Sequence, residues 1–173
     1  MKNILFIIFI LFLSISNKIE ANTDIVFVDM DKILSSSKAG VSILSQLKII
    51  NTNNLKKFKK SEKLLKEKET KIISQKNILS EEKFNKEISL LKSDIKKYND
   101  DRNKINNNFN KLKLENTNKL LQLINPILTT YADENSIEMI LQKKTIIMGK
   151  TEFDISNKII TIVNNNIKEF KIK

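Results

Sequence analysis

The apolar positions of the chain change their spacing several times, and each change predicts a new element. After the opening segment, a short β-rich run, Ile25, Val26, Phe27 and Val28, ends at Asp29. Such a run predicts a strand. The pattern then allows a single helical turn over Met30–Leu34, which three consecutive serines at 35–37 end.

A long stretch from about Lys38 to Ile124 has helical periodicity, with one Gly at its start and no Pro. Its first half places Leu44, Phe58, Leu65, Ile72 and Leu79 at multiples of seven residues, with Asn51 in the missing position. Its second half alternates steps of four and three, as a coiled-coil seam does. The apolar members of that second seam are Phe84, Ile88, Leu91, Ile95, Tyr98, Ile105, Phe109 and Leu112.

A break between the two halves lies at residues 77–82. Ser80 is a candidate N-cap, and Glu81 and Glu82 follow where carboxylates favour a helix start. We therefore expect an antiparallel helical hairpin with its tip near 77–82, in preference to one continuous rod. Arms of roughly 42 and 45 residues would be about 60–65 Å long.

The remaining chain predicts smaller elements. Pro126 marks a kink or a new first turn, and helix continues over Ile127–Asp133. Two β-rich runs, Ser136–Leu141 and Thr145–Met148, flank Lys143-Lys144 and predict a β-hairpin. A final amphipathic helix starts at Asp154-Ile155-Ser156.

The expected fold class is α+β, with a small strand-rich oligomerisation body and a long antiparallel α-helical coiled-coil hairpin inserted into it. The body comprises residues 22–37 and 125–173, and the arm residues 38–124. A body of about 65 residues without disulfides or metal has little core of its own, so the sequence predicts an oligomer. The strand Ile25–Val28 is the candidate oligomer element.

Residues 1–21 are typical of a secretory signal peptide. Lys2 precedes an unbroken apolar run from Ile4 to Leu13, and cleavage is expected after Ala21 or Ser16. The run is short for a span of roughly 20 residues, so an uncleaved anchor is the alternative.

Missing residue types exclude common chemistries. The chain has no Cys and no His, which excludes thiolate zinc sites and Ser-His-Asp triads. Its two Gly, Gly40 and Gly149, cannot form a phosphate-binding loop. We expect no enzyme activity, cofactor or metal.

The net charge of +11 lies in the predicted arm. Residues 38–119 hold 21 basic and 10 acidic side chains, whereas the rest of the chain after residue 21 sums to −1. The candidate contact charges are Lys56, Lys57, Lys59, Lys60, Lys63 and Lys66. Lysine enrichment in an AT-rich genome is an alternative explanation. Export argues against nucleic acid as a partner.

Two further groups are assigned from their positions. Phe58, Phe84, Tyr98 and Phe109 lie on seam positions and are expected in the helix interface. Ile78 and Leu79 lie at the tip, where they form either a contact patch for other proteins or a local clamp of the turn.

The ordered motifs of the chain resemble the Skp/OmpH family of periplasmic chaperones. The matching segments are Val26–Leu34, Ser37–Gly40, Leu79–Lys83, Asn125–Leu128 and Asp154–Ser156 followed by Ile159 and Ile160. Their order and spacing extend over essentially the whole chain after residue 21.

The resemblance implies a jellyfish-like homotrimer in the periplasm of a Gram-negative bacterium. Three strand-bearing bodies would associate, and three arms would surround a cavity that holds unfolded outer-membrane proteins without ATP. Further expected partners are an anionic membrane surface or lipopolysaccharide, although this chain carries Lys where Arg-mediated contacts would be needed. The alternative function is a structural coiled-coil envelope protein tethered by an uncleaved N-terminus.

Overall fold

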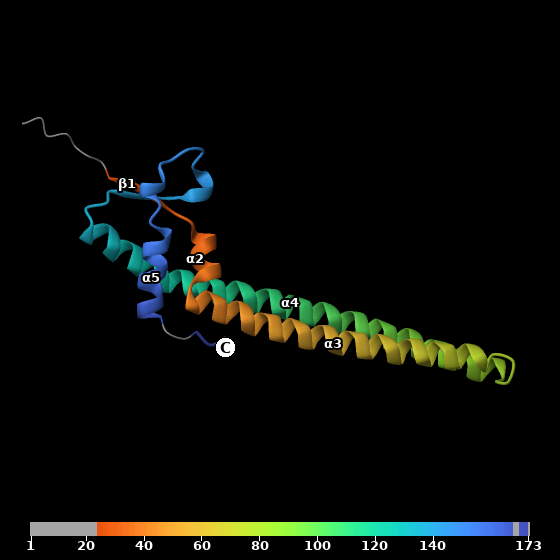
Figure 1. The fold of residues 1–173 in the computed structure, drawn as a ribbon. Helices are drawn as coiled ribbons and strands as arrows, with labels where there is room; N and C mark the ends of the chain where they lie inside the picture. Colours follow the sequence, from red (N-terminus) through yellow and green to blue (C-terminus); the bar gives the residue numbers. More distant parts are fainter. Residues whose placement is uncertain (1–23, 168–169, 173) are drawn as a thin grey trace, which may run out of the picture.

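The computed structural model describes residues 24–167 and 170–172. The expected signal peptide, residues 1–21, lies outside them. Figure 1 shows a long two-helix arm that extends from a small body, and the body contains both ends of the described chain. None of the helices in this part of the chain is both long and apolar enough to cross a membrane.

The arm consists of α3 (Lys38–Ser74) and α4 (Glu81–Glu134), which pack against each other in antiparallel directions. The structure therefore has the hairpin rather than the continuous rod. At 1.5 Å per residue, α3 is about 55 Å long and α4 about 80 Å. The length of α4 differs from the prediction because the helix continues through Pro126 and into the body. Hence no helix end marks the expected boundary between 124 and 125.

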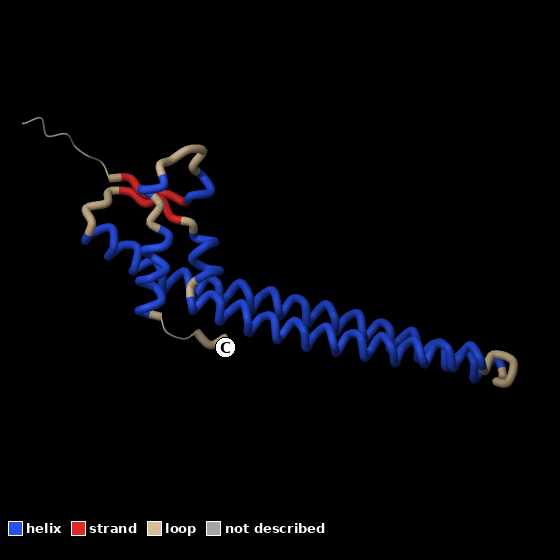
Figure 2. The backbone as a smooth tube through the Cα atoms, viewed as in Figure 1, coloured by secondary structure: helices blue, strands red, loops and turns tan. Residues whose placement is uncertain are grey.

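A two-stranded parallel sheet lies at the end of the body away from the arm (Figure 2). It pairs β1 (Ile25–Val28) with β2 (Met139–Gln142), in the register Ile25 to Met139 and Val28 to Gln142. Residues 154 and 155, just before the last helix, lie along the other edge of β1, where the Ile155 N–H donates to the Phe27 carbonyl at 3.0 Å.

The expected β-hairpin between 136–141 and 145–148 is wrong. β2 pairs with β1, Lys143–Thr145 forms a 3₁₀ turn, and residues 145–148 are not in a strand. Ile147 and Met148 are almost fully exposed, at 103% and 90%. The β-rich run at 145–148 therefore does not form a strand, because β1 offers β2 a parallel partner far away in the sequence.

The short helix α2 (Met30–Ser36) connects β1 to the arm. Ser37 ends α2 and also caps α3, where its side chain accepts a hydrogen bond from the Gly40 N–H at 3.1 Å. Gly40 allows α2 to approach, because a Cβ at this position would lie 1.8 Å from the Leu34 carbonyl oxygen. The serine break is thus present, after two turns of helix rather than one.

The body core forms where α5 (Ser156–Asn166) crosses α2, α3 and α4. This crossing buries large apolar side chains of α2, α4 and α5 completely: Ile33, Leu120, Ile124, Ile159 and Val163. Buried apolar area is the main stabilising contribution here. The predicted start of the last helix at Asp154-Ile155-Ser156 is confirmed.

Candidate functional site in the helical arm

The predicted seam lies at the α3–α4 interface for most of its length. Phe58, Ile72 and Leu91 are buried. Other seam members are partly buried: Leu65, Phe84, Ile88, Tyr98, Ile105, Phe109 and Leu112. The burial of these side chains holds the two arm helices together.

Two seam predictions are wrong. Leu44 is 49% exposed, and Ile43 and Leu47 are buried in its place. A straight helix drifts by about 20° per heptad, so a position two heptads before Phe58 has rotated out of the interface. Ile95 is 40% exposed; at this level the contact between the helices is an ion pair, with Lys68 Nζ 2.6 Å from Asp94 Oδ2.

A polar and aromatic cluster connects the helices at mid-arm. The Tyr98 hydroxyl donates to Glu62 Oε1 at 2.5 Å, and Arg102 Nη1 lies 3.5 Å from the same oxygen. The Tyr98 ring meets Phe58 edge-on at 6.5 Å between centroids, and the Arg102 guanidinium lies 5.5 Å from the Phe58 centroid. The hydrogen bond to Glu62, followed by desolvation, raises the pKa of Tyr98.

A groove of about 500 Å³ opens beside this cluster. Its apolar lining comes from both helices: Phe58, Leu64, Leu65, Tyr98 and Ile105. Its charged lining is mainly basic: Lys57, Lys60, Lys68, Lys97 and Arg102, with Asp94 and Asp101. The groove therefore combines apolar surface with cations, and pockets of this size hold ligands up to drug size.

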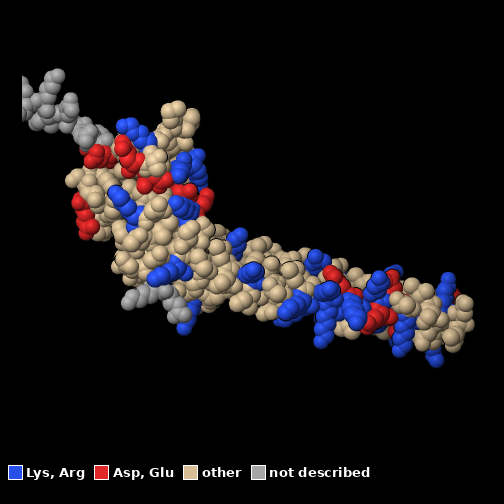
Figure 3. Space-filling view, viewed as in Figure 1, with Lys and Arg blue, Asp and Glu red and all other residues tan. Residues whose placement is uncertain are grey.

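The six candidate lysines of the arm do not share one surface. Lys57 and Lys60 line the groove, whereas Lys56 and Lys59 do not. Lys63 and Lys66 line a separate hollow with Glu67, and Lys63 Nζ lies 3.7 Å from Glu67 Oε1. All six are exposed, and Figure 3 shows basic side chains distributed along the arm.

The two tip residues that the sequence grouped together differ in their exposure to solvent. Ile78 is 81% exposed, whereas Leu79 is half-buried and lines a hollow with Ile72. Ser80 is the N-cap residue of α4, but its side chain makes no capping hydrogen bond. Glu81 and Glu82 lie in the first turn, as expected.

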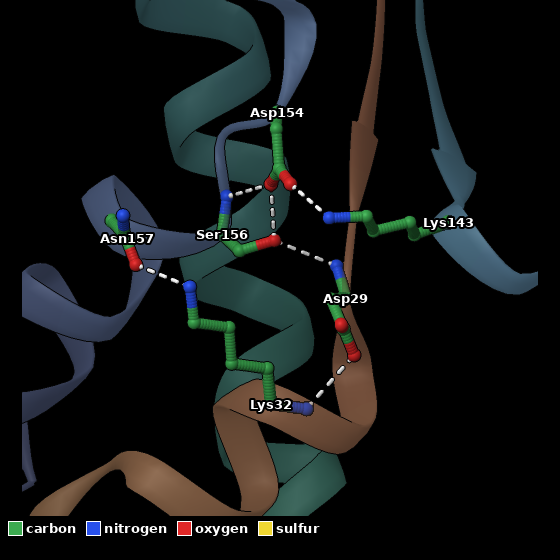
Figure 4. Close-up of polar contacts among 6 residues, drawn as sticks. All are labelled: Asp29, Lys32, Lys143, Asp154, Ser156 and Asn157. Carbon is green, nitrogen blue, oxygen red and sulfur yellow. Dashed lines mark hydrogen bonds and ion pairs between the residues drawn. The ribbon is translucent and has the colours of Figure 1, made fainter. Parts of the chain in front are cut away.

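The body holds a polar network that joins three chain segments (Figure 4). Asp154 accepts hydrogen bonds from Lys143 Nζ at 2.7 Å and from both the N–H and the hydroxyl of Ser156. The Ser156 Oγ in turn accepts from the Asp29 N–H at 2.8 Å. Burial favours a raised pKa for Asp154, but these hydrogen bonds outweigh burial and lower it to about 2.

Neither the arm nor the body offers a metal centre within residues 24–167 and 170–172. Among these residues no group of three or more Asp and Glu side chains is placed to hold an ion.

Comparison with known proteins identifies the family. The family model described as outer membrane protein (OmpH-like) matches residues 24–163. The chain belongs to the OmpH-like family. A search of curated proteins gives no match.

The OmpH-like fold is also found in a solved structure. The crystal structure of a candidate outer membrane chaperone (OmpH-like) from Caulobacter crescentus CB15 superimposes with a TM-score of 0.79 at 11% sequence identity. The match covers 87% of this chain and 89% of that one. This similarity confirms the long helices on a small body as the family's fold.

Two parts of this OmpH-like arm and body were absent from the sequence predictions. The sequence predictions gave Glu62 no contact, although it accepts a hydrogen bond from Tyr98 across the hairpin. The Lys143–Asp154 pair was not predicted either. Both contacts depend on the register between distant segments, and the local spacing of residues does not indicate that register. A Tyr and an Arg four residues apart on one helix face were the available hint for the first.

Proposed function

We propose that this OmpH-like protein is an ATP-independent chaperone that holds unfolded outer-membrane proteins in the periplasm and prevents their aggregation. Membership of the OmpH-like family supports the proposal, as does the fold shared with the Caulobacter candidate chaperone. On this proposal the N-terminal segment is a signal peptide and the protein has no catalytic activity.

The observation that carries the proposal is the surface of the arm. The arm presents exposed lysines together with exposed large apolar side chains, among them Leu64, Ile73 and Ile78. Many weak contacts of both kinds suit a protein that must bind unfolded chains without trapping them. Several arms acting together would supply avidity while each contact remains labile.

The proposed active form is a homotrimer in which three bodies associate and three arms surround a cavity. Val26, Phe27 and Val28 are already buried within one chain, so these side chains are not free to form the contact. Ile25 and its ladder partner Met139 are 42% and 50% exposed. We expect these two, together with the exposed Ile147 and Met148, to lie between subunits.

The test uses the purified protein and an unfolded outer-membrane β-barrel protein diluted from urea. Light scattering should show slower aggregation, and size-exclusion chromatography with light scattering should show a soluble complex and the mass of the chaperone oligomer. No effect on aggregation and no complex would contradict the proposal.

The contribution of arm charge is measured in the same assay. Replacing Lys56, Lys57, Lys59 and Lys60 by Gln should weaken capture, most strongly at low ionic strength where charges are least screened. Equal capture by wild type and variant at every salt concentration would support lysine enrichment without functional selection.

A further inference from the structure

The mid-arm groove is an open cavity whose shape is fixed by contacts between α3 and α4. We propose that it binds a short extended peptide segment in which a large aromatic side chain is flanked by carboxylates. The inference rests on the proposed function, because unfolded proteins supply such segments, and it assigns them a specific site on the arm.

The shape of the groove is set by contacts between the two helices. Glu62 is bound by Tyr98 and Arg102, and Asp94 is bound by Lys68. These contacts fix the aromatic edge formed by Phe58 and Tyr98. A groove that is already formed costs less ordering on binding than one that must be assembled.

The interior of the groove is left open by small and polar residues at the interface. Ser61 and Lys68 lie between the apolar residues Phe58, Leu65 and Ile72 along α3, and both line the groove. An aromatic side chain entering beside Leu64 and Leu65 would cover apolar surface that is now open to solvent. A volume of about 500 Å³ is sufficient for one such side chain and part of its backbone.

The charge of the groove selects the residues beside the aromatic one. The internal contacts pair Lys68 with Asp94 and Arg102 with Glu62. Lys57, Lys60 and Lys97 make no ion pair within residues 24–167 and 170–172. The groove thus has three cations without an ion-pair partner and one further carboxylate, Asp101. This excess of positive charge favours binding of an acidic peptide segment.

The helix provides matched control positions. Leu64 lines the groove and is 56% exposed, whereas Leu55 is 57% exposed and does not line it. The two positions are nine residues apart, which is half a turn from the same face at 100° per residue. Lys56 and Lys59 are the corresponding controls for Lys57 and Lys60.

The experiment titrates the full protein into a short peptide that carries one Trp between two Glu. Since the protein has no Trp, the fluorescence reports the peptide alone. Binding in the groove should shift the emission to the blue. Leu64→Gln should raise the Kd roughly fivefold to tenfold and Leu55→Gln by less than about twofold.

The charge variants are read in the same titration. The pair K57Q/K60Q should weaken binding more than K56Q/K59Q, and the same peptide with Gln in place of Glu should bind weakly to every form. Equal effects of the two lysine pairs, or of the two leucine variants, would overturn the inference.

Aggregation suppression by the same samples separates this inference from the proposed function. If the wild type suppresses aggregation but the groove variants bind the peptide like their controls, only the peptide-binding role of the groove is contradicted. A wild type that binds the peptide in the groove but does not suppress aggregation contradicts the chaperone proposal alone.

Discussion

Lys143 Nζ lies 2.7 Å from Asp154 Oδ2, and this pair joins the turn after β2 to the start of α5. The Asp154 side chain is only 15% exposed and also accepts both hydrogen bonds from Ser156. One carboxylate therefore links the turn after β2 to the start of α5.

Asp154→Asn should lower the free energy of unfolding at neutral pH by about 1 to 2 kcal/mol. The folded-state pKa of Asp154, about 2, lies below the ordinary value of 3.8. The stabilisation is therefore complete above the ordinary pKa and is lost as pH falls toward the folded-state value. Urea unfolding followed by circular dichroism should show the difference between variant and wild type shrinking from about pH 5 to about pH 2.

The exposed Glu152 provides the control for that measurement. Its ion pair with Lys150 spans 3.3 Å, but both side chains are more than half exposed. Glu152→Gln should change stability little at any pH, because exposed pairs contribute weakly. An equal and pH-independent loss in both variants would contradict the assigned role of Asp154.

Gly40→Ala should destabilise the body by about 3 kcal/mol or more, since the added methyl group would collide with the Leu34 carbonyl. Thermal unfolding measures the loss. Val41→Ala is the neighbouring control, because Val41 is 49% exposed and should tolerate truncation. A Gly40→Ala protein as stable as the control would show that α2 and α3 need not approach so closely.

Ile72→Ala and Ile73→Ala test the packing of the arm near its tip. Ile72 is 3% exposed and Ile73 is 60% exposed, so they compare a buried and an open site one residue apart. Removing the buried side chain should cost about 2 to 4 kcal/mol and the exposed one less than about 1 kcal/mol. Urea unfolding at a fixed protein concentration checks both. Similar losses would mean that the seam has another register.

Glu62→Gln should lower the pKa of the Tyr98 phenol. Its raised pKa has the hydrogen bond to Glu62 as the largest cause, and the neutral amide is a weaker acceptor. The chain has two Tyr, so a Tyr131→Phe background leaves the ultraviolet absorbance change on titration to Tyr98 alone. An unchanged titration would contradict the contact across the hairpin.

The arm was predictable from the sequence because its information is local. Two helices and a turn follow from three local signals. These are the 3.6-residue period, the N-cap position at Ser80 and the absence of Pro between 38 and 124. The same locality limits the seam prediction: Leu44 and Ile95 have the correct spacing but are exposed. Helical drift and the Lys68–Asp94 pair decide these positions, and neither is visible in a list of apolar residues.

The body was less predictable because its sheet is not local. The run at 145–148 has the composition of a strand, yet β2 takes its hydrogen bonds from β1 at the other end of the chain. The groove was hidden for a similar reason. The sequence grouped Lys56, Lys57, Lys59 and Lys60 by adjacency, whereas the helix assigns two of them to the groove and two elsewhere.

The parallel ladder between β1 and β2 has a consequence for how the chain folds. Ile25 pairs with Met139, 114 positions further along the chain. Closing a loop of that length early would cost conformational entropy without any immediate contact in return. The helical hairpin removes most of this cost, because it returns the chain to its starting point before the strands meet. The arm therefore shortens the search by which β1 and β2 find each other.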